Sequence, residues 1–172
     1  MRSEKHKKLV DILVFTMLGV IMLLSKLLME ALPNFHLLGT LITAYTIVYR
    51  KDALKPIYIF VLLSGIIYGF SAWWFAYLYI WAILWGMVML LPKNMKPKIA
   101  VPVYMIVSGL HGILYGTLYA PAQAVIFGYD FKTMLAWIVA GFPFDIMHCV
   151  GNMVLGILIL PIATALKKFH KY

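Results

Sequence analysis

The sequence is poor in charge and in cysteine. Only 12% of its 172 residues are charged and 64% are hydrophobic, against about 25% and about 45–50% in an average soluble domain. A core of this size cannot bury so much apolar surface, which excludes a soluble enzyme, a nucleic-acid-binding domain and a disordered tail despite the net charge of +9. The single cysteine, Cys149, cannot form an intrachain disulfide, and the chain has no CxxC pair for metal or redox chemistry.

Long apolar runs predict membrane helices. One crossing needs about 20 mostly apolar residues, so six crossings would use roughly 120 residues. We expect an all-α membrane protein, in which residues 1–172 form a single domain of six transmembrane helices with an outer loop over residues 120–142. The predicted helices cover residues 9–29, 37–49, 56–70, 73–91, 99–119 and 143–166. The first run is longer than a signal-peptide core and lacks a small-x-small cleavage site, so we expect it to be retained. Residues 131–140 could form a short helix across the outer mouth.

The cations alternate along the chain with the predicted crossings. Thirteen of the 15 Lys and Arg residues lie in the two tails and in the second and fourth connections; only Lys26 and Lys132 lie elsewhere. Basic loops stay on the cytoplasmic side of a membrane, so both termini are predicted to be cytoplasmic. The surplus is most simply a signal of orientation and of contact with anionic lipid, with docking of a partner protein as the alternative.

Polar residues recur on one face of the last predicted helix. Asp145, His148 and Asn152 follow one another at i, i+3 and i+7, a spacing that places them on the same side. Ionisable groups inside a membrane are costly and normally face the bundle interior or a wet cavity. The trio therefore predicts one polar wall of a ligand cavity below the outer surface. Alternatively, Asp145 caps the helix, His148 bonds to a neighbouring backbone and Asn152 joins two helices.

A second stripe lies on the predicted helix over residues 99–119. His111, Tyr115 and Tyr119 follow at i, i+4 and i+8 and lead toward the outer face, with Gln123 just beyond. The common face predicts that these side chains contribute to the same cavity.

The predicted helix over residues 73–91 carries a third set of candidates. Tyr77, Trp81 and Trp85 are in phase on one side, and their rings could either stack on a planar ligand or pack against neighbouring helices. Asn34 and His36 belong to the first outer loop, where they could close over the site or be solvated. All five are predicted substrate-binding residues.

Several catalytic motifs are absent from the sequence. It has no GxxxxGK[ST] loop for ATP, no HExxH pair and no GxSxG nucleophile. We therefore expect no enzymatic activity and no cofactor. His111, Asp145 and His148 could in principle ligate a transition metal, but without known facing helices no metal is predicted. Two GxxxG motifs, Gly65–Gly69 and Gly112–Gly116, mark sites where helices can approach closely.

Residues 116–161 resemble the integral-membrane S components of energy-coupling factor (ECF) transporters. The specific part of the resemblance is a PFDxxHxxGN motif, and the length, six helices and basic tails agree across the chain. The residues that carry the motif are Pro143, Phe144, Asp145, His148, Gly151 and Asn152.

The resemblance implies a six-helix fold with a substrate cavity in its outer half, between helices four to six. It also implies a prokaryotic plasma-membrane protein that does not hydrolyse ATP itself. Such a protein binds a vitamin or related micronutrient, associates with a transmembrane coupling protein and two cytoplasmic ATPases, and topples to release its substrate inward. The aromatic stripe and the few charges favour a planar heterocycle as substrate.

Docking on the coupling protein is expected to use small residues. In this family the first helix often carries a small-xxx-small motif, and the small groups in that region here are Thr16 and Gly19. We add Gly65 and Gly69 as candidate docking residues. Arg2 stands where cobalt and nickel members of the family carry a histidine, which argues against a metal as substrate.

Two other functions remain open on the sequence. The chain could be a stand-alone secondary carrier or small channel that works as an oligomer, although its two halves show no convincing match of the kind that inverted repeats produce. It could also be an assembly subunit without a ligand, in which Asp145, His148 and Asn152 serve packing alone.

Overall fold

The computed structural model describes residues 4–32 and 35–169, and this part of the chain is helical without any strand. Four helices are long and apolar enough to cross a membrane, at Glu4–Leu28, Ala72–Met89, Pro97–Phe127 and Phe131–Phe169. Only about a third of each apolar window is buried inside the protein. Large apolar side chains such as Ile12 and Met17 are more than 60% exposed, which suits contact with lipid rather than water.

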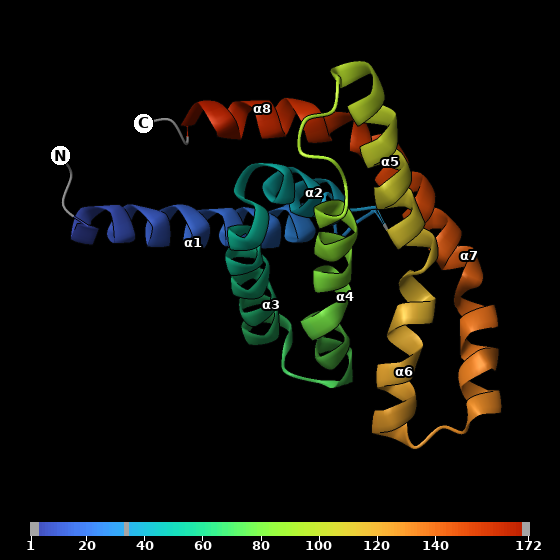
Figure 1. The fold of residues 1–172 in the computed structure, drawn as a ribbon. Coiled ribbons are helices and arrows are strands. Elements are labelled where there is room, and N and C mark those ends of the chain that lie inside the picture. The colour runs from blue at the N-terminus through green and yellow to red at the C-terminus, as the bar shows by residue number, and fades with distance from the viewer. Residues whose placement is uncertain (1–3, 33–34, 170–172) are drawn as a thin grey trace.

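The third and fourth of these segments are each divided by a local break (Figure 1). The helices are α1 Glu4–Leu28, α2 Leu38–Tyr49, α3 Leu54–Tyr68, α4 Ala72–Met89, α5 Pro97–Ile113, α6 Tyr115–Phe127, α7 Phe131–Leu155 and α8 Ile159–Phe169. Short 3-10 turns at Arg50–Ala53 and Gly156–Leu158 join α2 to α3 and α7 to α8.

The helices form a body and a projecting hairpin (Figure 1). In the body α1 packs on α3, and α2 lies against α4 and α8. The α5 helix packs along α7 and continues into α6, so α6 and the first half of α7 stand side by side as a hairpin, in which α6 also packs against α4 of the body. The described ends of α1 and α8 project to the same side of the molecule.

The central element is α2, whose residues from Leu38 to Thr46 are all buried. A helix that is apolar on every side belongs inside a protein. At 1.5 Å per residue its 12 residues span about 18 Å, and the 15 residues of α3 span about 22 Å, both less than the roughly 30 Å of a bilayer core. The predicted helices at 37–49 and 56–70 are therefore present, but neither is among the four long apolar ones.

The outer loop predicted over residues 120–142 is wrong. Helix α6 continues to Phe127 and α7 begins at Phe131, so only three residues connect them. Pro121 and Pro143 suggested helix boundaries, yet both lie inside helices, because neighbouring helices and side chains can satisfy the backbone groups that a proline frees in a membrane helix. The true boundary is marked by Gly128, which has a left-handed φ of 68° typical of a residue that follows a helix.

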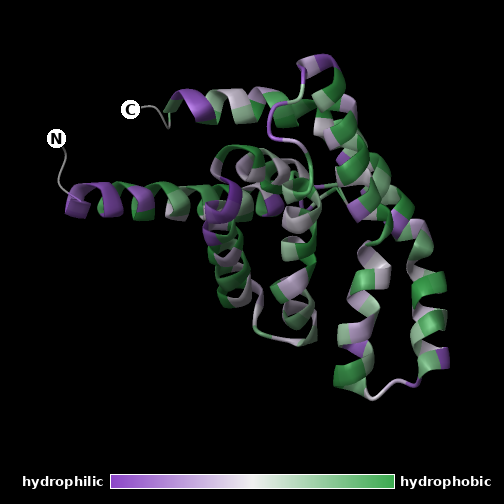
Figure 2. Cartoon of the chain, viewed as in Figure 1, coloured by the Kyte–Doolittle hydropathy of each residue, from purple (hydrophilic) through white to green (hydrophobic). Residues whose placement is uncertain are grey.

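The apolar core lies within the body, not within the hairpin. Its largest fully buried side chains include Trp81, Phe60 and Met22, whereas the only buried residue of α6 is Ala120. The buried residues of α7 are Asp145, His148, Gly151 and Asn152. The polar face of this helix is thus directed inward, while hydrophobic residues dominate the long helices elsewhere and hydrophilic ones gather near the chain ends (Figure 2).

Candidate ligand cavity

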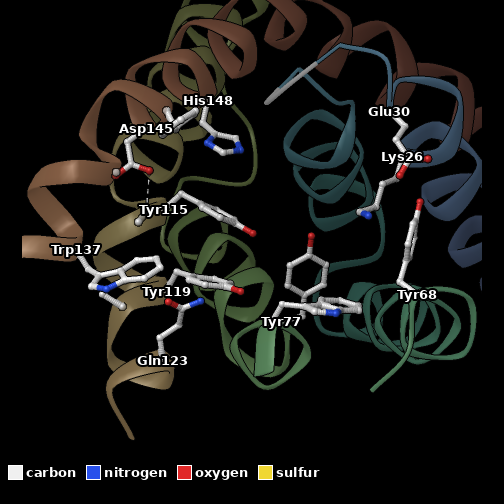
Figure 3. Close-up of a pocket in the computed structure, with 15 residues that line it drawn as sticks. Lys26, Glu30, Tyr68, Tyr77, Tyr115, Tyr119, Gln123, Trp137, Asp145 and His148 are labelled. Atoms are coloured by element: carbon white, nitrogen blue, oxygen red, sulfur yellow. Dashed lines mark hydrogen bonds between the residues drawn. The ribbon is translucent and has the colours of Figure 1, made fainter. Parts of the chain in front are cut away.

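A cavity of about 570 Å³ separates the α6–α7 hairpin from the ends of α1, α3 and α4 (Figure 3). Small-molecule sites commonly measure about 300–1,000 Å³. The lining residues are Lys26, Glu30, Tyr68, Trp73, Tyr77, Tyr115, Gly116, Tyr119, Ala120, Gln123, Trp137, Gly141, Phe144, Asp145 and His148.

Asp145 is held in place by the break between α5 and α6. The chain leaves regular helical geometry at Leu114, and the backbone N–H of Gly116 donates to Asp145 Oδ1 at 2.8 Å instead of to a carbonyl of its own helix. Because Gly116 is in the first turn of α6, the carboxylate also lies at the positive end of the helix dipole. Asp145 therefore caps a helix other than its own.

The second oxygen of this carboxylate, Oδ2, has no hydrogen-bond donor among the described residues. The Asp145 side chain is only 2% exposed. A Cβ atom at Gly116 would lie 2.5 Å from Oδ2, so only glycine at this position allows the carboxylate to approach α6. A buried carboxylate oxygen without a donor is costly, and here it borders a cavity.

Aromatic rings form most of the remaining wall. The rings of Tyr115 and His148 are stacked with centroids 4.7 Å apart, and Tyr119 stacks on the other side of Tyr115 at 6.0 Å. Across the cavity, Trp73 meets Tyr77 edge-to-face at 5.0 Å. These rings give the cavity flat apolar surfaces of the kind that bind planar ligands.

The wall opposite Asp145 carries a compensated cation (Figure 3). The ammonium group of Lys26 lies 3.7 Å from the centroid of the Tyr68 ring. Glu30 follows Lys26 at i+4 and also lines the cavity. Lys26 thus has both an aromatic face and a nearby carboxylate, whereas Asp145 has no cation: the one ion pair among the described residues joins Lys55 to Asp52.

Six of the predicted binding residues line the cavity. They are Asp145, His148, Tyr115, Tyr119, Gln123 and Tyr77. His111 and Trp81 lie behind this wall, both only 1% exposed. His111 Nε2 is 3.0 Å from the carbonyl oxygen of Ile80, and the Trp81 ring packs between those of His111 and Tyr77.

Three other predicted binding residues, Asn152, Trp85 and His36, do not line the cavity. Asn152 donates from Nδ2 to the carbonyl of Ser108 at 3.0 Å and so joins α7 to α5. Trp85 donates to the carbonyl of Arg50 at 3.0 Å, next to the α2–α3 connection. His36 packs against His148 with ring centroids 5.5 Å apart. Asn34 lies outside the described residues.

The four predicted docking residues have different surroundings. Thr16 is exposed on α1, but a Cβ at Gly19 would lie 2.6 Å from Ile59 Cγ2, so this glycine serves the contact between α1 and α3. Gly65 is closely covered by Phe70. Gly69 ends α3 with a left-handed φ of 84° and is exposed.

The prediction missed several lining residues, above all Trp137, Tyr68 and Lys26. The sequence places Trp137 in the outer connection, at most in a short separate helix over residues 131–140, because Pro143 favours a helix start. Lys26 had a usable signal, since it is one of only two cations outside the basic clusters. No local pattern marks Tyr68, because its place at the cavity depends on how α3 packs against α1 and α4.

The described residues contain no group of three or more His, Cys, Asp or Glu side chains placed to hold a metal ion. Comparison of the chain with protein-family models, with curated proteins and with solved structures gives no match. Fold and cavity together define an all-helical protein with four helices long and apolar enough to cross a membrane, and with a ligand-sized cavity beside a buried carboxylate.

Proposed function

We propose that the chain is the substrate-binding S component of an ECF-type ABC importer. In this role it captures a vitamin or related micronutrient outside the cell, and a transmembrane coupling protein with two cytoplasmic ATPases drives uptake. The observation that carries the proposal is the cavity in which Asp145 and His148 of the PFDxxHxxGN motif meet the aromatic rings of Tyr115, Tyr119 and Tyr77.

The shape and composition of the cavity support capture of a small ligand. Its volume of about 570 Å³ suits a molecule of vitamin size. Flat rings supply most of the contact area, and a few polar groups at one end can fix orientation. This is the arrangement expected of a binding subunit.

Co-purification tests the proposal directly. The tagged chain is expressed in its native host and purified in mild detergent. Proteins that co-purify with it are identified by mass spectrometry. A coupling protein and two ATPases should accompany it, and liposomes that contain the chain alone should not accumulate substrate. Uptake by the chain alone, without ATPases, would instead indicate a secondary carrier.

A further inference from the structure

The unpaired oxygen of Asp145 identifies the kind of group that the cavity receives. Asp145 Oδ1 is used by Gly116, but Oδ2 is buried and has no donor among the described residues. Capping of α6 therefore accounts for Oδ1 of this carboxylate but not for Oδ2. A carboxylate oxygen in this position is satisfied by a ligand that brings an N–H donor, best of all a positively charged one.

The charges around the cavity favour a cation. The lining groups with full or potential charge are Lys26, Glu30, Asp145 and His148. Lys26 belongs to the last turn of α1, and Glu30 follows four residues later, just after the helix. Their opposite charges therefore offset each other on one wall. Asp145 has no such partner, and an uncompensated carboxylate in a membrane protein is strongly disfavoured. A cationic ligand would supply the missing charge.

The aromatic walls point the same way. Faces of tyrosine and tryptophan rings attract cations, and the cavity already shows this with the Lys26 ammonium group 3.7 Å from the Tyr68 ring centroid. Tyr77, Tyr119 and Trp137 present further rings to the same space. Rings around a buried carboxylate form a site for a flat organic cation.

We propose that the cavity selects a planar ligand that carries a protonated amine, amidine or similar cationic N–H group, which binds Asp145 Oδ2. This inference rests on the proposed function and specifies its substrate class. An anionic or neutral heterocycle would leave the Asp145 carboxylate without a counter-charge. An anionic heterocycle would also be repelled by the carboxylate.

Three small probes of the same shape test this charge preference. Benzamidinium, benzamide and benzoate are all planar and differ mainly in charge, so ligand-observed NMR titrations in neutral maltoside micelles can compare their affinities, with empty micelles as the blank. The wild-type chain should bind benzamidinium at least about tenfold more tightly than benzamide. The free energy of a charge-assisted hydrogen bond is large enough to produce this difference in affinity. Benzoate should bind most weakly. This order can be measured without any variant.

Three variants locate the preference. Asp145→Asn should reduce the difference between benzamidinium and benzamide to about threefold or less, which corresponds to the loss of one charged contact. Asp130→Asn, which removes the same charge at an exposed position that does not line the cavity, should leave the preference unchanged. Gly116→Ala keeps every charge but displaces the carboxylate, so it should also weaken benzamidinium binding.

Several results would overturn the inference. They are equal binding of the three probes, a preference for benzoate or benzamide, absence of benzamidinium binding, or loss of the preference in Asp130→Asn but not in Asp145→Asn. None of these results affects the proposed function if the coupling protein and ATPases still co-purify with the chain. Conversely, absence of these partners with a retained benzamidinium preference would reject the importer role and keep the cation site.

Discussion

At the scale of single residues, Asp145 has two roles that belong to its two oxygens. Oδ1 caps α6 through Gly116, and Oδ2 remains for a ligand. The sequence indicated both roles but offered them as alternatives, a helix cap or a cavity wall. It could not show that the capped helix is α6 rather than the helix that carries Asp145, because this depends on the break at Leu114.

Gly116→Ala should lower stability by about 1–3 kcal/mol, because the new methyl group displaces the carboxylate and leaves a buried donor and acceptor unpaired. Gly86 in α4 is the matched control, since a Cβ there meets nothing within 4 Å. Gly86→Ala should be neutral or stabilising by up to about 1 kcal/mol. Thermal unfolding in detergent measures both variants, and equal effects would show that Asp145 does not need this glycine.

Asn152→Ala should reduce stability by about 1–2 kcal/mol, because the side chain joins α7 to α5 through Ser108. Ligand affinity should stay unchanged, since Asn152 does not line the cavity. Thr164→Ala serves as control: this hydroxyl bonds only to Leu160 of its own helix, so its loss should change stability by less than about 0.5 kcal/mol. A clear loss of ligand affinity in Asn152→Ala would place this residue in the site after all.

At the scale of elements, the α6–α7 hairpin places half of the cavity wall. It depends on a short connection in which Gly128 adopts a left-handed φ and Asp130 caps α7 through the backbone N–H of Thr133 at 2.7 Å. The sequence predicted the polar face of α7 correctly, because helical spacing alone determines which residues share a side. Because Pro143 favours a helix start, the sequence allowed only a separate short helix over residues 131–140. It did not show that this segment is continuous with the polar helix, as α7 is, or that Trp137 lines the cavity.

The cap of α7 should depend on pH. Hydrogen bonds from the Thr133 side chain and backbone hold the pKa of Asp130 below its ordinary value, so the charged cap binds more strongly than the protonated one. Its contribution is complete above the ordinary pKa and is lost as the pH falls through the lowered pKa. Measured relative to the intrinsic exchange rate at each pH, the protection of the amides in residues 131–134 should therefore fall in acid.

Two substitutions separate the cap from its charge. In Asp130→Ala the same amides should exchange faster at every pH, whereas Asp130→Asn should preserve protection and lose the acid dependence, because an amide oxygen still accepts the hydrogen bond. Unchanged exchange in Asp130→Ala would show that the first turn of α7 is stabilised by packing alone.

At the scale of the whole molecule, four long apolar segments surround a buried α2, and the short α3 packs against α1 and α4. Hydropathy predicted the apolar character and nearly all the helices, since these depend on local composition. The short length of α2 and α3 was visible too, but their place inside the fold was not. Which helices face lipid and which face one another depends on tertiary packing, which no local pattern records.

The alternation of basic connections predicts that both termini are cytoplasmic. In a Cys149→Ser background, single cysteines at Ser71 or Lys132 should react with a membrane-impermeant maleimide in intact cells. Cysteines at Lys51 or Lys93 should react only after the membrane is permeabilised. These four positions are exposed in the structure. The reverse pattern would invert the orientation and place the cavity on the cytoplasmic side.

We expect the space between the α6–α7 hairpin and the body to hold a small ligand. Gly141 lines this space and a Cβ there meets nothing within 4 Å, whereas its neighbour Ala140 is exposed and does not line it. Gly141→Trp should fill the cavity, and Ala140→Trp adds a bulky side chain outside it as the control.

The decisive measurement is mass spectrometry of the small molecules released from the gently purified wild-type chain and from both variants. We expect one small molecule at about one per chain in the wild type and in Ala140→Trp, and its loss in folded Gly141→Trp. No released molecule in the wild type, or equal retention in both variants, would contradict this expectation.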